Sequence, residues 1–118
     1  MLIALTSGTW QFEINIFGQS SSTAGTQFGV NYTGTVTSIG AVQIGQLATT
    51  TWAATALITA NNTASTVCMT TANVETSVRI TGQIVVSTSG NLTARGLKVT
   101  SGTLTYRSAC WMQAIKVA

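Results

Sequence analysis

The chain has 118 residues, a length that fits one domain with its own hydrophobic core. Apolar residues make up 45% and charged residues only 6%, with a net charge of +3, and this balance excludes an intrinsically disordered chain. Histidine is absent, so the usual acid–base residue of enzymes near neutral pH is missing, and proline is absent, so turns must use Gly, Asn and Ser.

The first third of the chain predicts strands separated by short turns. Residues 2–5 form a short apolar segment that ends before the turn residues Ser7 and Gly8. Residues 10–16 then alternate strictly, because an apolar face of Trp10, Phe12, Ile14 and Ile16 is interleaved with polar residues. After a Ser- and Gly-rich loop at 18–25, the alternation of Phe28, Val30 and Tyr32 predicts the next strand.

The middle of the chain keeps a β-branched character. Gly34 and Gly40 punctuate a segment that carries Val36, Ile39, Val42 and Ile44. Residues 49–59 contain three alanines and could form a helix, but their high Thr content favours a strand. A turn at Asn61 and Asn62 precedes a short strand at 66–69.

The last third predicts a long strand that Asn73 opens and Val86 closes, with Gly82 marking a bulge or kink in its middle. The turn Ser89-Gly90-Asn91 leads into a return strand whose apolar face begins at Leu92 and shifts to Leu97 and Val99. A turn at Ser101-Gly102 and strands at 103–106 and 109–117 complete the chain. Eight to ten short strands at this spacing, without any capped helical period, predict an antiparallel β-sandwich or barrel over residues 1–118.

The aromatic residues are the first candidates for a binding surface. Trp10, Phe12, Trp52 and Trp111 are expected in the core or at a subunit interface, because aromatic rings bury much area at low entropic cost. The alternative for the tryptophans is a platform on which sugars stack.

Few residues of this chain could take part in catalysis. Glu13 and Glu75 are the only carboxylates, and both lie at polar strand positions where a solvated side chain is expected. Cys68 and Cys110 have no histidine to activate them as nucleophiles or to complete a zinc site. They are either two small buried hydrophobic residues or a disulfide, and the spacing decides neither. We therefore expect a protein that is not an enzyme and holds no cofactor.

The five basic residues predict no nucleic-acid interface, because they are spread singly over the C-terminal half. The apolar runs are far shorter than the roughly 20 residues that cross a bilayer, so no membrane insertion is expected. The first five residues are apolar, but no basic residue precedes them, and we expect no secretory signal peptide.

Three segments resemble the C1q/TNF-like jelly-roll domains of bacteriophage structural proteins. The opening LTSGTWQFEINIFGQSS is similar to the family's first strand, SGT turn and alternating aromatic–acidic strand. The segment SVRITGQIVVSTSGNLTARGLKVT resembles its long hairpin, and SACWMQAIKVA resembles its last strand, with a bulky pair at Trp111-Met112 before Lys116. The sequence departs from the family in starting its first strand almost at Met1, where members usually carry an anchoring segment.

The resemblance implies an all-β jelly roll that forms homotrimers and performs no catalysis. It implies a virion protein, assembled in the bacterial host cytoplasm, that decorates or cements the capsid or forms a fibre head and contacts capsid or tail proteins. The alternative is a carbohydrate-binding module at a tail-fibre tip that recognises a host-surface glycan, and a secreted adhesin is a third hypothesis.

Overall fold

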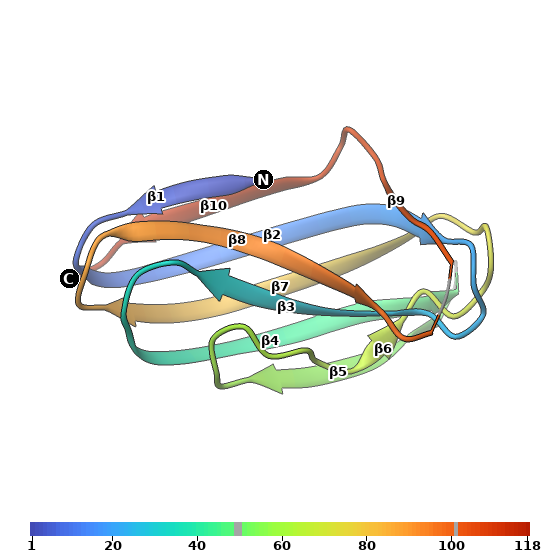
Figure 1. Cartoon of the computed structure of the whole chain (residues 1–118), viewed down its shortest axis with the longest axis horizontal. Helices are drawn as coiled ribbons and strands as arrows, with labels where there is room; N and C mark the ends of the chain where they lie inside the picture. The colour runs from blue at the N-terminus through green and yellow to red at the C-terminus, as the bar shows by residue number, and fades with distance from the viewer. Residues whose placement is uncertain (49–50, 101) are drawn as a thin grey trace.

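The computed structural model describes residues 1–48, 51–100 and 102–118, with the side chains of residues 53–55 left out. The described residues contain ten strands and no helix (Figure 1). The strands are β1 (Leu2–Leu5), β2 (Gly8–Ser20), β3 (Thr26–Tyr32), β4 (Val36–Ala48), β5 (Thr51–Ile58), β6 (Val67–Cys68), β7 (Thr76–Val86), β8 (Gly90–Lys98), β9 (Leu104–Tyr106) and β10 (Trp111–Lys116).

The first eight strands pair in a nested order. β1 pairs with β8, β2 with β7, β3 with β6 and β4 with β5, all antiparallel. The resulting sheets have the orders β1-β8-β3-β6 and β10-β2-β7-β4-β5. Four nested antiparallel pairs folded over into two facing sheets are the jelly-roll arrangement of the sandwich class. The predicted all-β antiparallel sandwich is thus confirmed, and the nested pairing is consistent with the predicted jelly roll.

Two C-terminal strands extend the larger sheet beyond this eight-stranded unit. β10 pairs with residues 10–15 of β2, and β9 pairs with residues 18–20 of the same strand. Both therefore lie along one edge of the sheet. The chain end is fixed there as well, because the amide of Thr9 donates to the carbonyl oxygen of Ala118 at 2.9 Å. The molecule measures 40 × 24 × 22 Å, with the strands running along its long axis (Figure 1).

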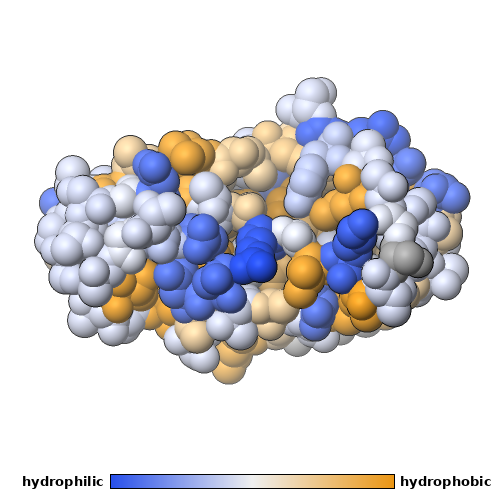
Figure 2. Space-filling view, in the orientation of Figure 1, coloured by the Kyte–Doolittle hydropathy of each residue, from blue (hydrophilic) through white to orange (hydrophobic). Residues whose placement is uncertain are grey.

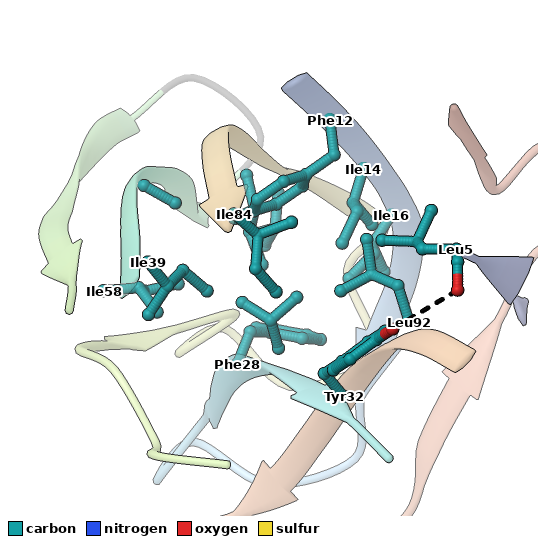
Figure 3. Packing of buried hydrophobic residues seen from close by; sticks show 14 of the residues in the cluster. Leu5, Phe12, Ile14, Ile16, Phe28, Tyr32, Ile39, Ile58, Ile84 and Leu92 are labelled. Carbon is teal, nitrogen blue, oxygen red and sulfur yellow. Dashed lines mark hydrogen bonds between the residues drawn. The ribbon is translucent and has the colours of Figure 1, made fainter. Parts of the chain in front are cut away.

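The core lies between the two sheets. In Figure 3, Phe28, Tyr32 and Leu92 from the smaller sheet meet Phe12 and Ile84 from the larger one. The inward positions of β2 stand opposite those of β7, which lines the core with one continuous apolar layer. The fully buried side chains include Leu5, Ile14, Ile16, Phe28, Val30, Met69, Val78, Ile80, Ile84, Val86 and Leu92.

The β4 strand differs from its sequence pattern. Val36 pairs with Val86 and Ile39 with Ile84, so three residues of β4 oppose two of β7 across a bulge. The bulge keeps both apolar side chains on the inner side, although they are three positions apart. Beyond it the alternation places Ala41 and Gln43 inside, whereas Ile44 is 43% exposed on the outside.

Gln43 is the polar residue that this register buries completely. Its Nε2 donates to the carbonyl oxygen of Thr66 at 3.2 Å, and the hydroxyl of Ser65 donates to its Oε1. Ser65 also donates its backbone N–H to Phe28, on the smaller sheet. Gln43 thereby links the larger sheet to the segment before β6, and its hydrogen bonds make its burial tolerable.

Several boundaries correct the sequence prediction. β2 and β4 each have 13 residues and β7 has 11, so the strands are not uniformly short. Asn73 lies in a turn with a φ of +58°, and the strand begins only at Thr76. The predicted strand at 49–59 is β5, with residues 49 and 50 outside the described part, as is Ser101 of the predicted 101–102 turn.

Gly82 is not at a bulge, because the register of β7 runs through it on both sides. A Cβ at Gly82 would lie 2.3 Å from the carbonyl oxygen of Gly40 and 2.4 Å from the Cα of Ala41. Glycine is needed here for the close approach of β4 to β7.

Candidate functional site

The outer face of the larger sheet carries a small cluster of polar and charged side chains. The Nε of Arg79 lies 3.4 Å from the Glu13 carboxylate and donates to Oδ1 of Asn15 at 3.3 Å. The amide of Asn15 in turn donates to the same carboxylate at 3.1 Å. The Arg79 side chain is 59% exposed, so the ion pair contributes little to stability. Its effect is to neutralise the charge of Glu13.

A shallow hollow of about 470 Å³ lies next to this cluster, on the same face. Two rows of cross-strand neighbours line the hollow. In one row Gln113 and Thr81 flank Glu13, and in the next Ile115, Gln11, Gln83 and Gly40 follow one another across β10, β2, β7 and β4. Its full lining is Gln11, Phe12, Glu13, Gly40, Thr81, Gly82, Gln83, Gln113 and Ile115. Its three glutamines make the hollow polar, and Arg79 neutralises the charge of Glu13, which also lines it.

The candidate aromatic residues occupy different places. Phe12 is a core residue, only 4% exposed. Trp10 is half-buried at the end of the sandwich, where its indole N–H donates to the carbonyl oxygen of Thr6 at 2.9 Å and the Lys116 ammonium lies 5.9 Å from its ring centroid. Trp52 and Trp111 are 55% and 42% exposed.

Of the two places expected for Trp111, the core of the subunit is excluded, because its side chain is on the outer face of the sheet. It pairs with Asn15 on the outer side of β2, whereas its neighbour Met112 pairs with the buried Ile14. Either residue of the Trp-Met pair could have faced inward, and only the pairing with β2 decides between them. Trp111 lies on the same outer face as the hollow, two residues before Gln113 on β10.

A second surface on this sheet is apolar. Residues 14–74 contain no charged residue, and this span includes all of β4 and β5. On their outer side Val42 pairs with Leu57, which is 75% exposed, and Ile44 follows two residues along β4. We call Val42, Ile44 and Leu57 the β4–β5 apolar surface. Apolar patches also lie among hydrophilic side chains on the face that Figure 2 presents.

The two carboxylates do not form a catalytic pair. Glu13 is paired with Arg79, and the Glu75 carboxylate lies 3.3 Å from the Nε of Arg107. Thr76, next to Glu75, pairs with Gly18, five residues along β2 from Glu13. At about 3.3 Å per strand residue the two positions are roughly 16 Å apart, well beyond the 9.5 Å limit of a glycosidase pair.

The two cysteines are free thiols, so the structure contains no disulfide between Cys68 and Cys110. Cys68 is fully buried, and this burial raises the pKa of its thiol to about 12. The thiol of Cys110 donates to the carbonyl oxygen of Phe17 at 3.2 Å. Both therefore act as packing residues in their own parts of the fold.

No group of three or more His, Cys, Asp or Glu side chains comes together within the described residues. The same part of the chain contains no helix with the length and apolar character to cross a membrane.

The hollow was missed by sequence reasoning, although its residues are visible as polar residues at alternating strand positions. Gln11, Gln83 and Gly40 are separated by up to 72 positions, and only the pairing of β2, β7 and β4 brings them together. Comparison of the chain with family models, with curated proteins and with solved structures finds no match.

Proposed function

We propose that this chain is a structural subunit of a bacteriophage particle that acts by self-association and surface contact. In this role it decorates or cements the capsid or forms the head of a fibre. It assembles as a homotrimer in the cytoplasm of the bacterial host and contacts capsid or tail proteins. The jelly-roll fold and the resemblance of the opening, hairpin and last-strand segments support this role.

The observation that carries the proposal is the β4–β5 apolar surface. Burying it between subunits would remove Val42, Ile44 and Leu57 from water at a gain of about 25 cal/mol per Å² of apolar area. β4 and β5 carry no charged residue, and the charge beside this surface, Arg79 opposite Ile44 on β7, is already paired with Glu13. Depletion of charge at the centre is also what distinguishes interface cores from ordinary surface.

The solution mass tests self-association. Sedimentation of the purified chain at micromolar concentration is expected to give three times the 12.2 kDa of one chain. Leu57→Lys places a charge on the β4–β5 apolar surface and is expected to shift the species to 12.2 kDa. Leu97→Lys, on the outer face of the smaller sheet, is the matched control and should leave the mass unchanged. A wild-type monomer at this concentration would contradict the proposal.

The location needs a separate measurement. Mass spectrometry of purified particles of the phage that encodes the chain is expected to detect it in a fixed ratio to the major capsid or tail protein. Its absence from particles that contain their full set of other structural proteins would rule out a role in the virion.

A further inference from the structure

Gly40 is a glycine whose position the packing of the monomer does not explain. It lies within β4 and faces outward into the hollow, and a Cβ added there would meet no atom within 4 Å. Its φ does not lie in the left-handed region, so its backbone does not require glycine either. Glycine inside a strand lowers stability by roughly 0.5–1 kcal/mol relative to alanine. In strands, such a glycine often marks a place where a ligand or another backbone approaches closely.

The side chains around Gly40 offer hydrogen bonds in both directions. Gln11, Gln83 and Gln113 each present a carboxamide, which has two donors and one acceptor oxygen, and Thr81 adds a hydroxyl. Within the described residues, no hydrogen bond engages any of the three carboxamides, and all three glutamines are exposed. They are therefore free to bind a ligand.

The electrostatics of the hollow favour a neutral ligand. Among the residues that the structure describes, Glu13 is the only ionisable one that lines it, and Arg79 and Asn15 already contact that carboxylate. An anionic ligand would approach Glu13, and a cationic ligand would compete with Arg79. A partner protein surface would have to match three carboxamides at once or leave them buried without partners, at a cost of about 1–3 kcal/mol each.

The size of the hollow and its apolar residues further restrict which ligand it can bind. The volume of about 470 Å³ falls in the usual range for small-molecule sites, roughly 300–1,000 Å³. Ile115 lines one side, and the half-exposed ring of Trp111 lies on the same face, about 7 Å along β10 from Gln113. The ligand should therefore combine many hydroxyl groups with an apolar C–H face.

We propose that the hollow formed by β10, β2, β7 and β4 binds a neutral oligosaccharide, with one sugar ring over Gly40. The three carboxamides and Thr81 bind hydroxyl groups along the oligosaccharide, and a later ring stacks on Trp111, which lies three strands across and four residues along from Gly40. This site goes beyond the structural role proposed above and does not depend on it, because the β4–β5 apolar surface shares none of its residues.

The experiment uses the full chain and defined probes. Neutral tri- and tetrasaccharides of glucose, galactose, mannose and N-acetylhexosamines are immobilised as an array beside sialylated and sulfated ones. The best ligand is then titrated in solution by saturation-transfer NMR. Gly40→Leu fills the hollow, and Ala4→Leu, on the outer face of the smaller sheet, is the matched control.

The wild type is expected to bind at least one neutral oligosaccharide. Gly40→Leu should weaken this binding at least ten-fold without lowering the melting temperature, and Ala4→Leu should not change it. Gln113→Ala should weaken it about three- to ten-fold, the range for one lost hydrogen bond. Trp111→Ala should weaken binding of tetrasaccharides more than that of trisaccharides.

Four results would overturn the site. They are no neutral ligand for the wild type at millimolar concentration, binding of anionic sugars only, binding that survives in a folded Gly40→Leu variant, and a fall in oligomeric mass caused by Gly40→Leu. The last result would assign the hollow to a second copy of the chain. Because the solution mass of the wild type is measured separately, failure of this site and failure of the proposed structural role can be told apart.

Discussion

Two glycines that lie close together on neighbouring strands, Gly82 and Gly40, should respond in opposite ways to the same substitution. Gly82 of β7 faces β4 so closely that a Cβ would lie 2.4 Å from the Cα of Ala41 and 2.5 Å from its Cβ. Gly40 lies on the partner strand, where the added methyl group would meet nothing within 4 Å. The two substitutions add the same methyl group, so the difference in stability between the two alanine variants isolates the effect of packing.

The expected size follows from which atoms clash. Overpacking typically costs 1–3 kcal/mol, and the contacts of Gly82 are with backbone atoms of a neighbouring interior strand, which cannot rotate away. We therefore expect Gly82→Ala to lower the free energy of unfolding by about 3 kcal/mol or more. With an unfolding entropy near 2.1 cal/mol/K per residue, this corresponds to a fall in melting temperature of about 12 °C for 118 residues. Gly40→Ala should instead raise stability by about 0.4–1 kcal/mol.

Thermal and urea denaturation, followed by far-ultraviolet circular dichroism and tryptophan fluorescence, measure both variants. The reasoning would be refuted if Gly82→Ala stayed within about 0.5 kcal/mol of the wild type, or if Gly40→Ala were the more destabilised of the two.

Three further predictions concern the core. Phe28→Ala empties a fully buried site and should cost about 3–5 kcal/mol in urea denaturation; a loss below 1 kcal/mol would mean that Phe28 is not in the core. Tyr32→Phe removes the hydroxyl that donates to the carbonyl oxygen of Thr88 at 2.7 Å, and the same assay should show a loss of about 1 kcal/mol. Burial raises the pKa of the Cys68 thiol to about 12, so stability should fall as pH rises from about 9, where the unfolded thiol ionises, towards 12. Urea midpoints should fall more steeply between pH 9 and 10 in the wild type than in Cys68→Ala, where only the raised pKa values of Tyr32 and Tyr106 still contribute; equal slopes would contradict the assignment.

The fold class could be predicted from local alternation alone. On β2 and β3 the apolar residues recur at every second position, and the structure buries Phe12, Ile14, Phe28 and Val30 as that pattern requires. Such a period belongs to the extended backbone itself, because successive side chains point to opposite faces. The turn residues between the strands are equally local, so strand number and fold class were within reach of the sequence.

Which side chains of a strand point into the core is harder to predict where the alternation is ambiguous. On β4 both sets of alternating residues contain apolar side chains, and only the bulge after Val36 places Gln43 inside and Ile44 outside. The burial of Gln43 further depends on the Thr66 carbonyl, which lies 23 positions away in the chain. A choice of this kind follows from the partners across the sandwich, which are not encoded in neighbouring residues.

The chain thus determined by itself that it is an uncommonly uncharged, all-β domain with alternating strands, because composition and period act locally. Tertiary structure decided the nested pairing of the strands, the outward position of Trp111 and the hollow around Gly40. The residues of the hollow come from positions 11–13, 40, 81–83, 113 and 115. They meet only because distant strands share hydrogen bonds, and the pairing of distant strands is a property of the whole chain.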